Sequence, residues 1–385
     1  MNKKNKMLLI LGFMAFLANG DNYAVALLLI NIANDLGLQL STAAISVSAY
    51  MLSFGLFTIL FGPLSDRFGK VQIITIAAFG TSIFSILGGF AFNLPSLIFF
   101  RAVNGAFAAG IFPVTLALVG QSFDDNSRHK AIGKVMGLMF LGGAMATIIG
   151  GALAYFASWR LVYIGYGVAE LLVSFIMIKF LEKDSNIVEK LRFFNAYKAP
   201  LSNMKFMRLV FVIFLVGFSV FGSFTYSGKL IQSISTLNIL QIGIILSLFG
   251  VGTVLGGKIA PKIKKSFGNI YFLIAGAIGF TSLAALGSIT AIWLLCLGFI
   301  GFGVAFIMMQ SSLVGAAQEM LPKMRGTAMS LASFNMFVGG AIGTAVNGLI
   351  VKNFNIANIY LITAFIFLIA TILATIFIGN FKKGT

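Results

Sequence analysis

Long apolar windows separated by short polar segments recur along the chain from its first residues to its last. Their approximate bounds are 7–31, 40–62, 71–91, 95–119, 131–156, 161–181, 209–231, 239–261, 270–289, 291–317, 327–351 and 358–379. Each window, at about 1.5 Å per residue in a helix, is long enough to cross roughly 30 Å of hydrocarbon. Strict alternation of apolar and polar positions is absent, so helices are expected rather than the strands of a membrane barrel. The pattern predicts an all-α integral membrane protein with twelve transmembrane helices.

The composition excludes a soluble globular enzyme. Hydrophobic residues make up 59% of the chain and charged residues only 10%, against about a quarter charged in soluble proteins. The single cysteine, Cys296, and the single histidine, His129, argue against a disulfide framework, a Cys/His zinc site and a cysteine nucleophile. No phosphate-binding Walker loop is visible in the sequence. We therefore expect no enzymatic activity, no metal and no cofactor.

The net charge of +17 is distributed in a way that predicts the orientation of the helices. With the N-terminus placed inside, nearly all Lys and Arg residues fall in inner segments. The exceptions are Arg160, Lys229 and Lys352, which fall outside, and Arg101, which falls within a window. This is the positive-inside pattern, and it places both termini in the cytoplasm of a multi-pass plasma-membrane protein. Because topology accounts for the charge, we expect no nucleic-acid partner.

A polar stretch and an internal repeat divide the chain into two parts. The longest hydrophilic connection, 182–207, separates six windows from six, so we predict one bundle over 1–181 and another over 208–385. The segment Met139–Ala144 of the fifth window matches Met336–Ala341 of the eleventh, which indicates duplication. Two pseudo-symmetric six-helix bundles with a substrate site between them at mid-membrane are typical of rocking transporters.

The second inner connection contains the segment Gly62-Pro63-Leu64-Ser65-Asp66-Arg67-Phe68-Gly69-Lys70. Its glycines allow a tight turn, and Asp66 can bind a helix N-terminus or pair with a basic residue. The segment resembles the G-x-L-x-D-R-x-G-(R/K) signature of the major facilitator superfamily. The resemblance implies a gating role for the signature residues Gly62, Asp66, Arg67, Gly69 and Lys70. In the second half the equivalent turn is expected at Gly257–Lys262, where Pro261 replaces the aspartate.

Two further segments are similar to family patterns. Arg101–Ala109 resembles the pattern of the fourth helix in proton-coupled members. The fifth window is similar to the antiporter signature G-x-x-x-G-P-x-x-G-G, which implies hinge roles for Gly142, Gly143, Gly150 and Gly151. It departs from that signature at Ala146 and Thr147. The resemblance implies the drug:proton antiporter branch, and energy from a gradient of H⁺, with Na⁺ as the alternative ion.

Three charged residues fall inside windows at mid-membrane depth: Asp21, Arg101 and Glu170. Charges at this depth are costly and commonly functional. Burial disfavours an ionised carboxylate and a nearby guanidinium favours it, so a rocking motion that changes the balance moves a proton. Our hypothesis assigns the proton to Asp21 first and to Glu170 second. The alternative is a static Asp21–Arg101 pair that only tethers two helices.

The substrate is less clearly indicated. Candidate lining residues are Asn22, Tyr23, Asn104, Met139, Tyr226, Gln310 and Asn335. Such a site suits lipophilic, neutral or cationic small molecules and suits dianions poorly. We expect a monomeric proton-coupled efflux antiporter with the lipid bilayer, a small-molecule substrate and H⁺ as partners. A proton-linked transporter of a sugar, nucleoside or other metabolite, and a non-transporting membrane receptor or scaffold, remain alternatives.

Overall fold

The computed structural model describes residues 3–183, 193–322 and 324–379, and no residue in these ranges lies in a β-strand. Twelve helical segments of this described part are long and apolar enough to cross a membrane. The prediction of an all-α membrane protein with twelve transmembrane helices is thereby confirmed.

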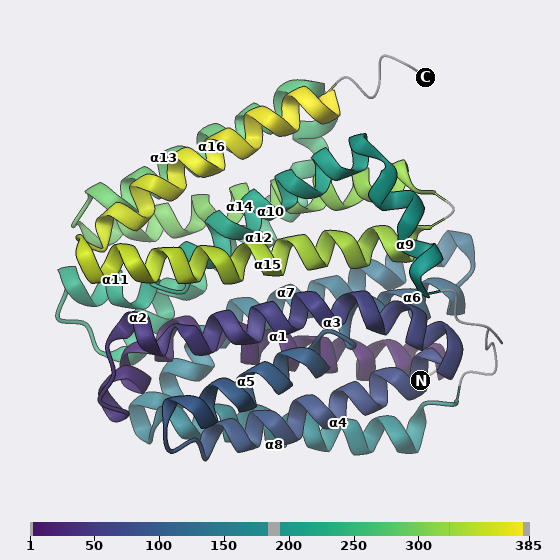
Figure 1. Cartoon of the computed structure of the whole chain (residues 1–385), viewed down its shortest axis with the longest axis horizontal. Helices are drawn as coiled ribbons and strands as arrows, with labels where there is room; N and C mark the ends of the chain where they lie inside the picture. Colours follow the sequence, from purple (N-terminus) through teal and green to yellow (C-terminus); the bar gives the residue numbers. More distant parts are fainter. Residues whose placement is uncertain (1–2, 184–192, 323, 380–385) are drawn as a thin grey trace.

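The helices form two groups, and the axes of most helices in both groups are roughly aligned (Figure 1). The first group consists of α1 (Lys3–Asp35), α2 (Leu40–Ala43), α3 (Ile45–Phe68), α4 (Lys70–Gly89), α5 (Leu94–Ala108), α6 (Phe112–Ser122), α7 (Asp125–Phe156) and α8 (Trp159–Phe180). The second group consists of α10 (Met204–Phe224), α11 (Ser227–Ile234), α12 (Ile239–Phe267), η1 (Gly268–Ile270), α13 (Tyr271–Ser288), α14 (Ile292–Met320), α15 (Arg325–Asn353) and α16 (Ala357–Gly379). The short helix α9 (Phe193–Ser202) precedes α10, inside the stretch expected to be a polar linker.

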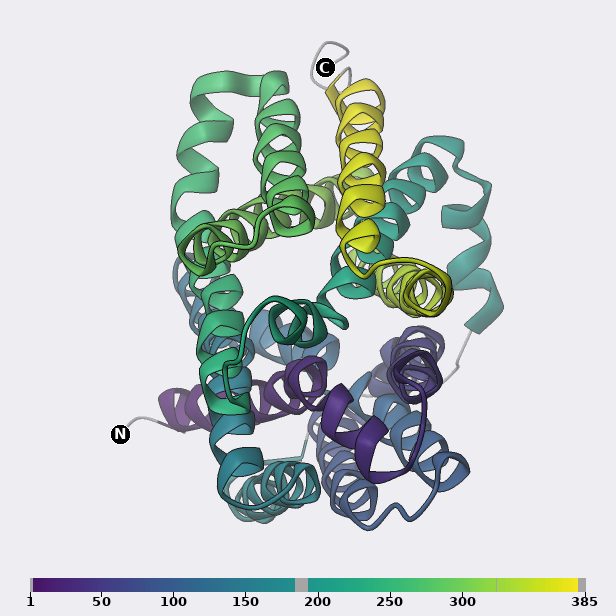
Figure 2. The same ribbon diagram turned by 90° about the vertical axis from the view of Figure 1, so that its left-hand side faces the viewer.

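Figure 2 looks along the helices from the end that carries α2 and α11, which we call the far end. The opposite end, where α1 begins and α16 finishes, is called the terminal end (Figure 1). The two groups contact one another mainly through α7 with α12 and α3 with α15, and at the far end through α1 with α11. The seam between the groups is therefore formed by helices from both parts of the internal repeat.

Repeated glycines explain why equivalent helices of the two groups pack in the same way. A Cβ atom on Gly142 of α7 would lie 2.1 Å from the carbonyl oxygen of Phe16 in α1. A Cβ atom on Gly339 of α15 would lie 2.2 Å from the carbonyl oxygen of Phe214 in α10. Only glycine permits these backbones to approach so closely, as in small-residue contacts of membrane helices. The duplicated sequence thus makes the same helix contact twice.

Three windows expected to be continuous helices are broken in the structure. The second window is interrupted at Ala44, between α2 and α3. The fourth window ends as α5 and resumes as α6, with Gly110 in the gap and Pro113 in the first turn of α6. Proline lacks the N–H that would continue the preceding helix, so a restart there is favourable. The seventh window changes direction at Thr225 and Tyr226, between α10 and α11. Hydropathy alone could not show the breaks in the fourth and seventh windows, because both sites lie within apolar sequence.

Candidate functional site

A buried ion pair joins α1 and α5 inside the first group. Arg101 Nη1 donates a hydrogen bond to Asp21 Oδ2 at 3.2 Å and a second to Asn104 Oδ1 at 3.3 Å. Asn104 Nδ2 in turn donates to the carbonyl oxygen of Thr81 on α4 at 2.9 Å. The side chains of Asp21 and Arg101 are each only 1% exposed. The structure thus brings together two of the three charged residues singled out in the sequence.

Two tyrosine rings flank the guanidinium of Arg101. Its Cζ lies 4.3 Å from the ring centre of Tyr50 on α3 and 5.0 Å from that of Tyr163 on α8. Cation–π contacts of this kind stabilise a desolvated guanidinium by about 2 kcal/mol. The Nε and Nη2 atoms of Arg101 have no hydrogen-bond partner among the described residues. One edge of the guanidinium is therefore engaged, and the other faces buried space without a polar partner.

Glu170 of α8 lies in the same buried region. Its side chain is fully buried, and neither carboxyl oxygen has a hydrogen-bond partner within the described residues. Asp21 and Arg101 both interact electrostatically with Glu170. An unpaired ionised carboxylate in such a place would cost several kcal/mol. Asp21 and Glu170 therefore differ in a basic respect, since Asp21 has a salt-bridge partner and Glu170 has none.

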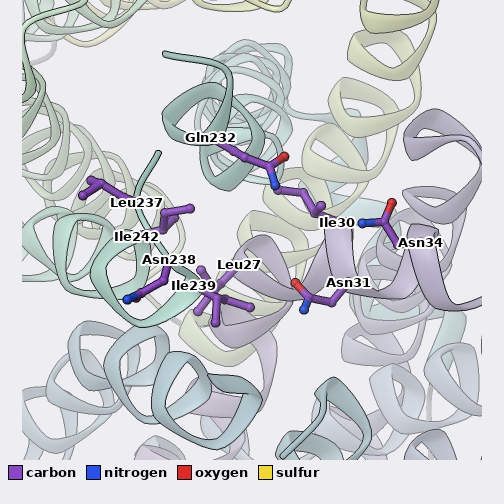
Figure 3. Close-up of a pocket in the computed structure, with 9 residues that line it drawn as sticks. All are labelled: Leu27, Ile30, Asn31, Asn34, Gln232, Leu237, Asn238, Ile239 and Ile242. Carbon is purple, nitrogen blue, oxygen red and sulfur yellow. The ribbon is translucent and has the colours of Figure 1, made fainter. Parts of the chain in front are cut away.

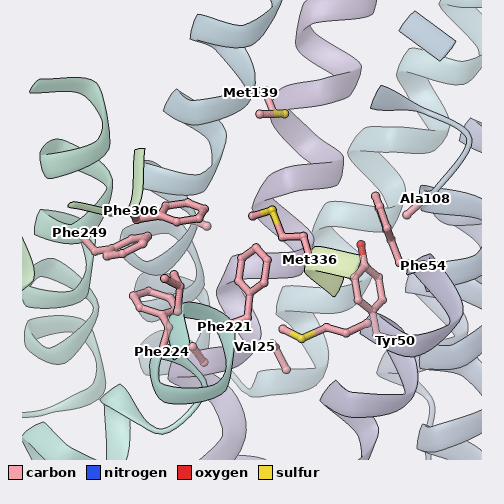
Figure 4. Close-up of a cluster of buried hydrophobic side chains, with 14 of the residues drawn as sticks. Val25, Tyr50, Phe54, Ala108, Met139, Phe221, Phe224, Phe249, Phe306 and Met336 are labelled. Atoms are coloured by element: carbon pink, nitrogen blue, oxygen red, sulfur yellow. The ribbon is translucent and has the colours of Figure 1, made fainter. Parts of the chain in front are cut away.

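Aromatic side chains occupy the seam between the two groups (Figure 4). Tyr23 of α1 lies with its ring centre 5.7 Å from that of Phe224, a residue of α10. Phe54 of α3 stacks on Phe337 of α15 with ring centres 3.9 Å apart. The rings of Phe221, Phe249 and Phe306 continue this cluster within the second group. The mid-membrane surface between the groups is thus apolar and aromatic.

Three of the seven expected lining residues, Tyr23, Met139 and Gln310, lie at or beside this aromatic seam. Tyr23 belongs to it, and Met139 lies beside it with Met336 (Figure 4). Gln310 Nε2 lies 3.8 Å from Met336 Sδ, and Gln310 Oε1 is buried without a partner in the described part of the chain. The Nδ2 of Asn335 donates to the carbonyl oxygen four residues earlier in its own helix. Asn22 is buried on α1, also with an unpartnered oxygen.

Two expected lining residues lie elsewhere. Asn104 is fully buried within the first group, where it binds Arg101 and the α4 backbone instead of facing the seam. Tyr226 is fully buried at the α10–α11 turn, and its hydroxyl donates to the carbonyl oxygen of Thr344 at 2.9 Å. These hydrogen bonds show that each residue satisfies polar groups of its own bundle, and the assignment of both as substrate-lining residues stays a prediction. The phenylalanines of the seam were missed, since nothing distinguishes them among 41 Phe.

The Gly62–Lys70 segment forms a helix and one sharp turn. α3 continues past Pro63 and ends at Phe68. The single residue Gly69, with φ of 90°, separates it from α4. Gly62 is thus a packing position rather than a turn, and a Cβ there would lie 3.3 Å from Ser330 Oγ of α15. Asp66 pairs with Lys70 at 3.1 Å, one of the two interactions expected for it. The Arg67 guanidinium lies 5.2 Å from the ring centre of Phe68.

Tyr197 of α9 replaces the backbone hydrogen bond that α3 loses at Pro63. Pro63 has no N–H to donate to the carbonyl oxygen of Ile59. The hydroxyl of Tyr197 donates to that oxygen at 2.7 Å. The helix before α10 is thereby attached to the first group. In the second group Gly257–Lys262, expected to be a turn, is helical within α12, and the chain turns instead at Gly268, with φ of 52°.

A small cavity of about 220 Å³ lies at the far end between α1 and the α11–α12 connection (Figure 3). Its polar lining consists of the amide side chains of Asn31, Asn34, Gln232 and Asn238. Leu27, Ile30, Leu237, Ile239 and Ile242 complete it. Since α1 belongs to one group and α11–α12 to the other, this cavity exists only while the groups are together at the far end.

A comparison of the sequence with models of known protein families identifies the family of this chain. Residues 11–344 match the model of the Major Facilitator Superfamily. The chain belongs to the Major Facilitator Superfamily. It is therefore a membrane transporter of this superfamily and not an enzyme. No group of three or more His, Cys, Asp and Glu that could hold a metal ion is present among the described residues.

Relatives and solved structures of the superfamily cover nearly the whole chain. An uncharacterized transporter of Bacillus subtilis, YceJ, is 24% identical over 88% of this chain and 87% of its own length. Multidrug resistance protein 3 of the same organism is 25% identical over 86% of this chain and 77% of its own. A bacterial homologue of the human lysosomal transporter Spinster, solved inward-facing and unoccupied, superposes with a TM-score of 0.79 at 20% identity. That comparison covers 100% of this chain and 98% of the homologue.

The glycines of the segment similar to the superfamily's antiporter signature face two directions. Gly142, Gly143 and Gly150 face α1, where added Cβ atoms would lie 2.1 Å from Phe16, 2.8 Å from Asn19 and 3.3 Å from Ala24. Gly151 faces the other group, 3.1 Å from the carbonyl oxygen of Ile239. α7 therefore packs tightly on α1 and also forms the seam with α12.

Proposed function

We propose that the chain is a proton-coupled secondary transporter that exports hydrophobic or cationic compounds by alternating access. The proposal rests on one observation above all: three buried charged residues lie inside the first group, on α1, α5 and α8, and one of them, Glu170, is a carboxylate without a hydrogen-bond partner among the described residues. Of these helices, α1 also contributes Tyr23 to the aromatic seam. Buried charges in transporters commonly mark ion pathways. The similarity to Multidrug resistance protein 3 supports the export of drug-like compounds.

Proton coupling is assigned to Asp21, Glu170 and Arg101. Arg101 uses only one edge on Asp21 and Asn104, and it lies within electrostatic reach of Glu170. When the two groups rock, small shifts of α1 against α5 change how strongly Arg101 stabilises the Asp21 carboxylate. Asp21 then binds a proton on one side of the membrane and releases it on the other. Gly62, Asp66, Arg67, Gly69 and Lys70 gate the terminal end, where α3 meets α15.

The aromatic seam accounts for the proposed substrates. Faces of Phe and Tyr bind cations and flat apolar molecules, and Met side chains adapt to different shapes. The seam presents rings from both groups, so a bound molecule would contact both. Flat aromatic metabolites such as nucleosides would stack on the same rings, which makes proton-linked nucleoside transport the second candidate.

The arrangement in the membrane follows from the charge distribution. We place the terminal end in the cytoplasm of a plasma-membrane protein, and we take the monomer as the transporting unit. The far end is closed in this structure, because α1 and α11 are in contact there and a Cβ on Gly228 would lie 2.9 Å from the Ala26 carbonyl oxygen. The external side is thus the closed side.

The test uses purified protein in liposomes with an acidic lumen. Tetraphenylphosphonium, glucose and uridine are added outside in separate assays while lumenal pH is followed. Antiport of the cation makes the lumen more alkaline, whereas symport of glucose or uridine makes it more acidic. We expect alkalinisation with tetraphenylphosphonium, and at least about a hundredfold loss of it in Asp21→Asn, the scale of a lost proton-transfer group.

A matched control is Asp35→Asn. Asp35 also pairs with an arginine, Arg160, but its side chain is 42% exposed at the far end. This variant should transport like the parent. Retained coupling in Asp21→Asn would remove Asp21 as the carrier. Binding of a compound to the purified protein without any transport of that compound across the membrane would favour a receptor or scaffold.

A further inference from the structure

A second cavity, of about 370 Å³, lies at the terminal end of the first group. The start of α1, the start of α4, the end of α6 and the end of α8 surround it. It is separate from the ion pair and from the aromatic seam, and no part of the second group lines it. None of the transport steps proposed above uses it.

The rim of this cavity carries an excess of positive charge. Lys3, Lys4 and Lys183 line it, with Glu182 as the only acidic residue among the described residues of its lining. Asp124, outside the lining, interacts electrostatically with Lys4. Lys3 Nζ forms a salt bridge with Glu182, so these two charges offset each other at the surface. Two lysines in excess of the acidic residue make the rim attractive to an anion. Basic clusters between helices at the cytoplasmic face are typical binding sites for acidic lipid head groups.

The floor of the cavity and the neighbouring helix face are apolar. Met7, Val71, Leu118, Phe180 and Leu181 are the apolar part of its lining, beside the polar residues Gln121 and Ser122. Phe180 is 39% exposed, and Ile176 and Leu172, spaced four residues apart along the same face of α8, are 42% and 61% exposed. Leu172 and Ile176 therefore form an exposed apolar strip along α8, which reaches the cavity at Phe180. There the ammonium group of Lys6 lies over the Phe180 ring. A soluble anion would leave this strip unused, whereas an acyl chain would lie along it.

We propose that this cavity binds the head group of an anionic phospholipid, with an acyl chain along Leu172, Ile176 and Phe180 of α8. The phosphate competes with Glu182 for Lys3 and adds Lys4 and Lys183 as further partners. The site takes a lipid from the leaflet at the terminal end, which the charge distribution makes the cytoplasmic leaflet. The inference does not depend on the transported substrate or on proton coupling.

The test compares lipid binding by full-length protein in nanodiscs of dioleoylphosphatidylcholine with increasing dioleoylphosphatidylglycerol. Native mass spectrometry of the released protein counts the retained phosphatidylglycerol. The triple variant Lys3→Gln, Lys4→Gln, Lys183→Gln should weaken its retention at least about tenfold, because each lysine near a membrane surface contributes to anionic-lipid affinity. Glu182→Gln should strengthen it, since the internal competitor for Lys3 is gone.

The matched control is the triple variant Lys258→Gln, Lys262→Gln, Lys265→Gln, which removes the same charge from the terminal end of α12, outside the cavity. It should change retention less than about twofold. Equal losses in both triple variants would overturn the site in favour of general surface charge. Equal thermal stability of the parent and the first triple variant in pure phosphatidylcholine shows that the variant is folded. If the variant is less stable than the parent, the Glu182→Gln variant alone is used for the test.

A competition assay separates the lipid from a soluble anion. Glycerol 3-phosphate and inorganic phosphate carry the same charged group without acyl chains. We expect neither to displace the lipid at millimolar concentration. Displacement by either one would overturn the lipid assignment and make the cavity a site for a soluble phosphate.

Discussion

The two groups of helices share a scaffold but bury different chemistry. Gly142 against Phe16 and Gly339 against Phe214 give the same close approach in each group, so the duplicated helices are positioned alike. Yet Asp21, Arg101 and Glu170, the buried charged residues of the described chain, all lie in the first group. The second group contributes most of the aromatic rings of the seam instead. The first group thus buries the charged residues and the second supplies most of the aromatic rings, which fits the proposed division between ion handling and substrate contact.

This division explains why the internal repeat is detectable only in part. Glycines at helix contacts had to remain, since any side chain there meets a backbone atom. Residues that face the interior of one group were free to change, because the duplicate needed no second ion pair. The comparison predicts different consequences for equivalent kinds of substitution in the two groups.

The largest effect is expected from Arg101→Met. The change leaves Asp21 buried without its partner, and breaking a buried pair costs about 3–5 kcal/mol. The free energy of unfolding, measured in detergent with a denaturant, should fall by that amount. The double variant Asp21→Asn, Arg101→Met should recover most of the loss, because Asp21 no longer leaves a buried charge without its arginine.

The control for this prediction is Arg160→Met. Arg160 pairs with Asp35, and the two side chains are 33% and 42% exposed. Exposed pairs contribute about 0–1 kcal/mol, so the variant should be close to the parent. Similar losses for Arg101→Met and Arg160→Met would contradict the special position of the buried pair.

The next largest effect concerns the feature that the groups share. Gly142→Ala and Gly339→Ala each place a methyl group about 2 Å from a backbone oxygen, and overpacking of this kind costs about 1–3 kcal/mol. The two losses should be similar if the groups pack alike. Gly133→Ala in α7 and Gly315→Ala in α14 meet no atom within 4 Å and serve as controls. A large loss of stability in only one of Gly142→Ala and Gly339→Ala would contradict the equivalent packing of the two groups.

A smaller effect is expected from Phe221→Leu in the second group. Phe221 stacks on Phe337 with ring centres 5.3 Å apart and also contacts Tyr23. Replacing the ring removes an aromatic contact worth about 0.5–1.5 kcal/mol, so KM for an aromatic cation should rise about fivefold. Proton coupling per transported molecule should not change. Altered stoichiometry would show that the two chemistries are not divided between the groups.

The smallest effect is expected from Tyr197→Phe. It removes one hydrogen bond to the Ile59 carbonyl oxygen, and such bonds in membrane proteins contribute about 0.6 kcal/mol on average. The loss should disappear in a Pro63→Ala background, because the introduced alanine would donate its own N–H to that oxygen. A double-mutant cycle on thermal stability measures this coupling. An unchanged loss in both backgrounds would mean that the tyrosine acts elsewhere.

The sequence carried enough information to predict most of the fold. Length and hydropathy of each window depend on the bilayer, so the number of crossing helices followed directly. The breaks at Gly110 and Tyr226 and the helical extension through Pro63 did not follow. The turn at Tyr226 and the helix through Pro63 depend on tertiary partners far away in sequence, Thr344 for Tyr226 and Tyr197 for the Ile59 carbonyl oxygen. The break at Gly110 depends on the nearby Pro113, which a hydropathy pattern does not take into account.

Some residues of the candidate site could also be predicted from the sequence, and others could not. Asp21, Arg101 and Glu170 were recognisable because charge is rare inside an apolar window. Asn104 and Tyr226 were expected to line the seam, and the structure shows their hydrogen bonds within their own groups. An uncharged polar residue carries no sign in the sequence of which way it faces. The aromatic seam was missed because phenylalanine is common throughout the chain. Depth in the membrane can be read from sequence, but orientation around a helix axis cannot be read without the neighbouring helices.

The ion pair also has a consequence for biosynthesis. Arg101 follows Asp21 by 80 residues, so a ribosome adding about 5–20 residues per second makes it roughly 4–16 s later. During that interval α1 has no guanidinium partner. A carboxyl group can enter a bilayer in its neutral form, whereas a guanidinium keeps its charge. Because Asp21 precedes Arg101 in the sequence, its carboxyl group is already in the membrane when the helix that carries Arg101 is inserted. In a chain with these two residues exchanged, the arginine would be inserted before its counter-ion was made.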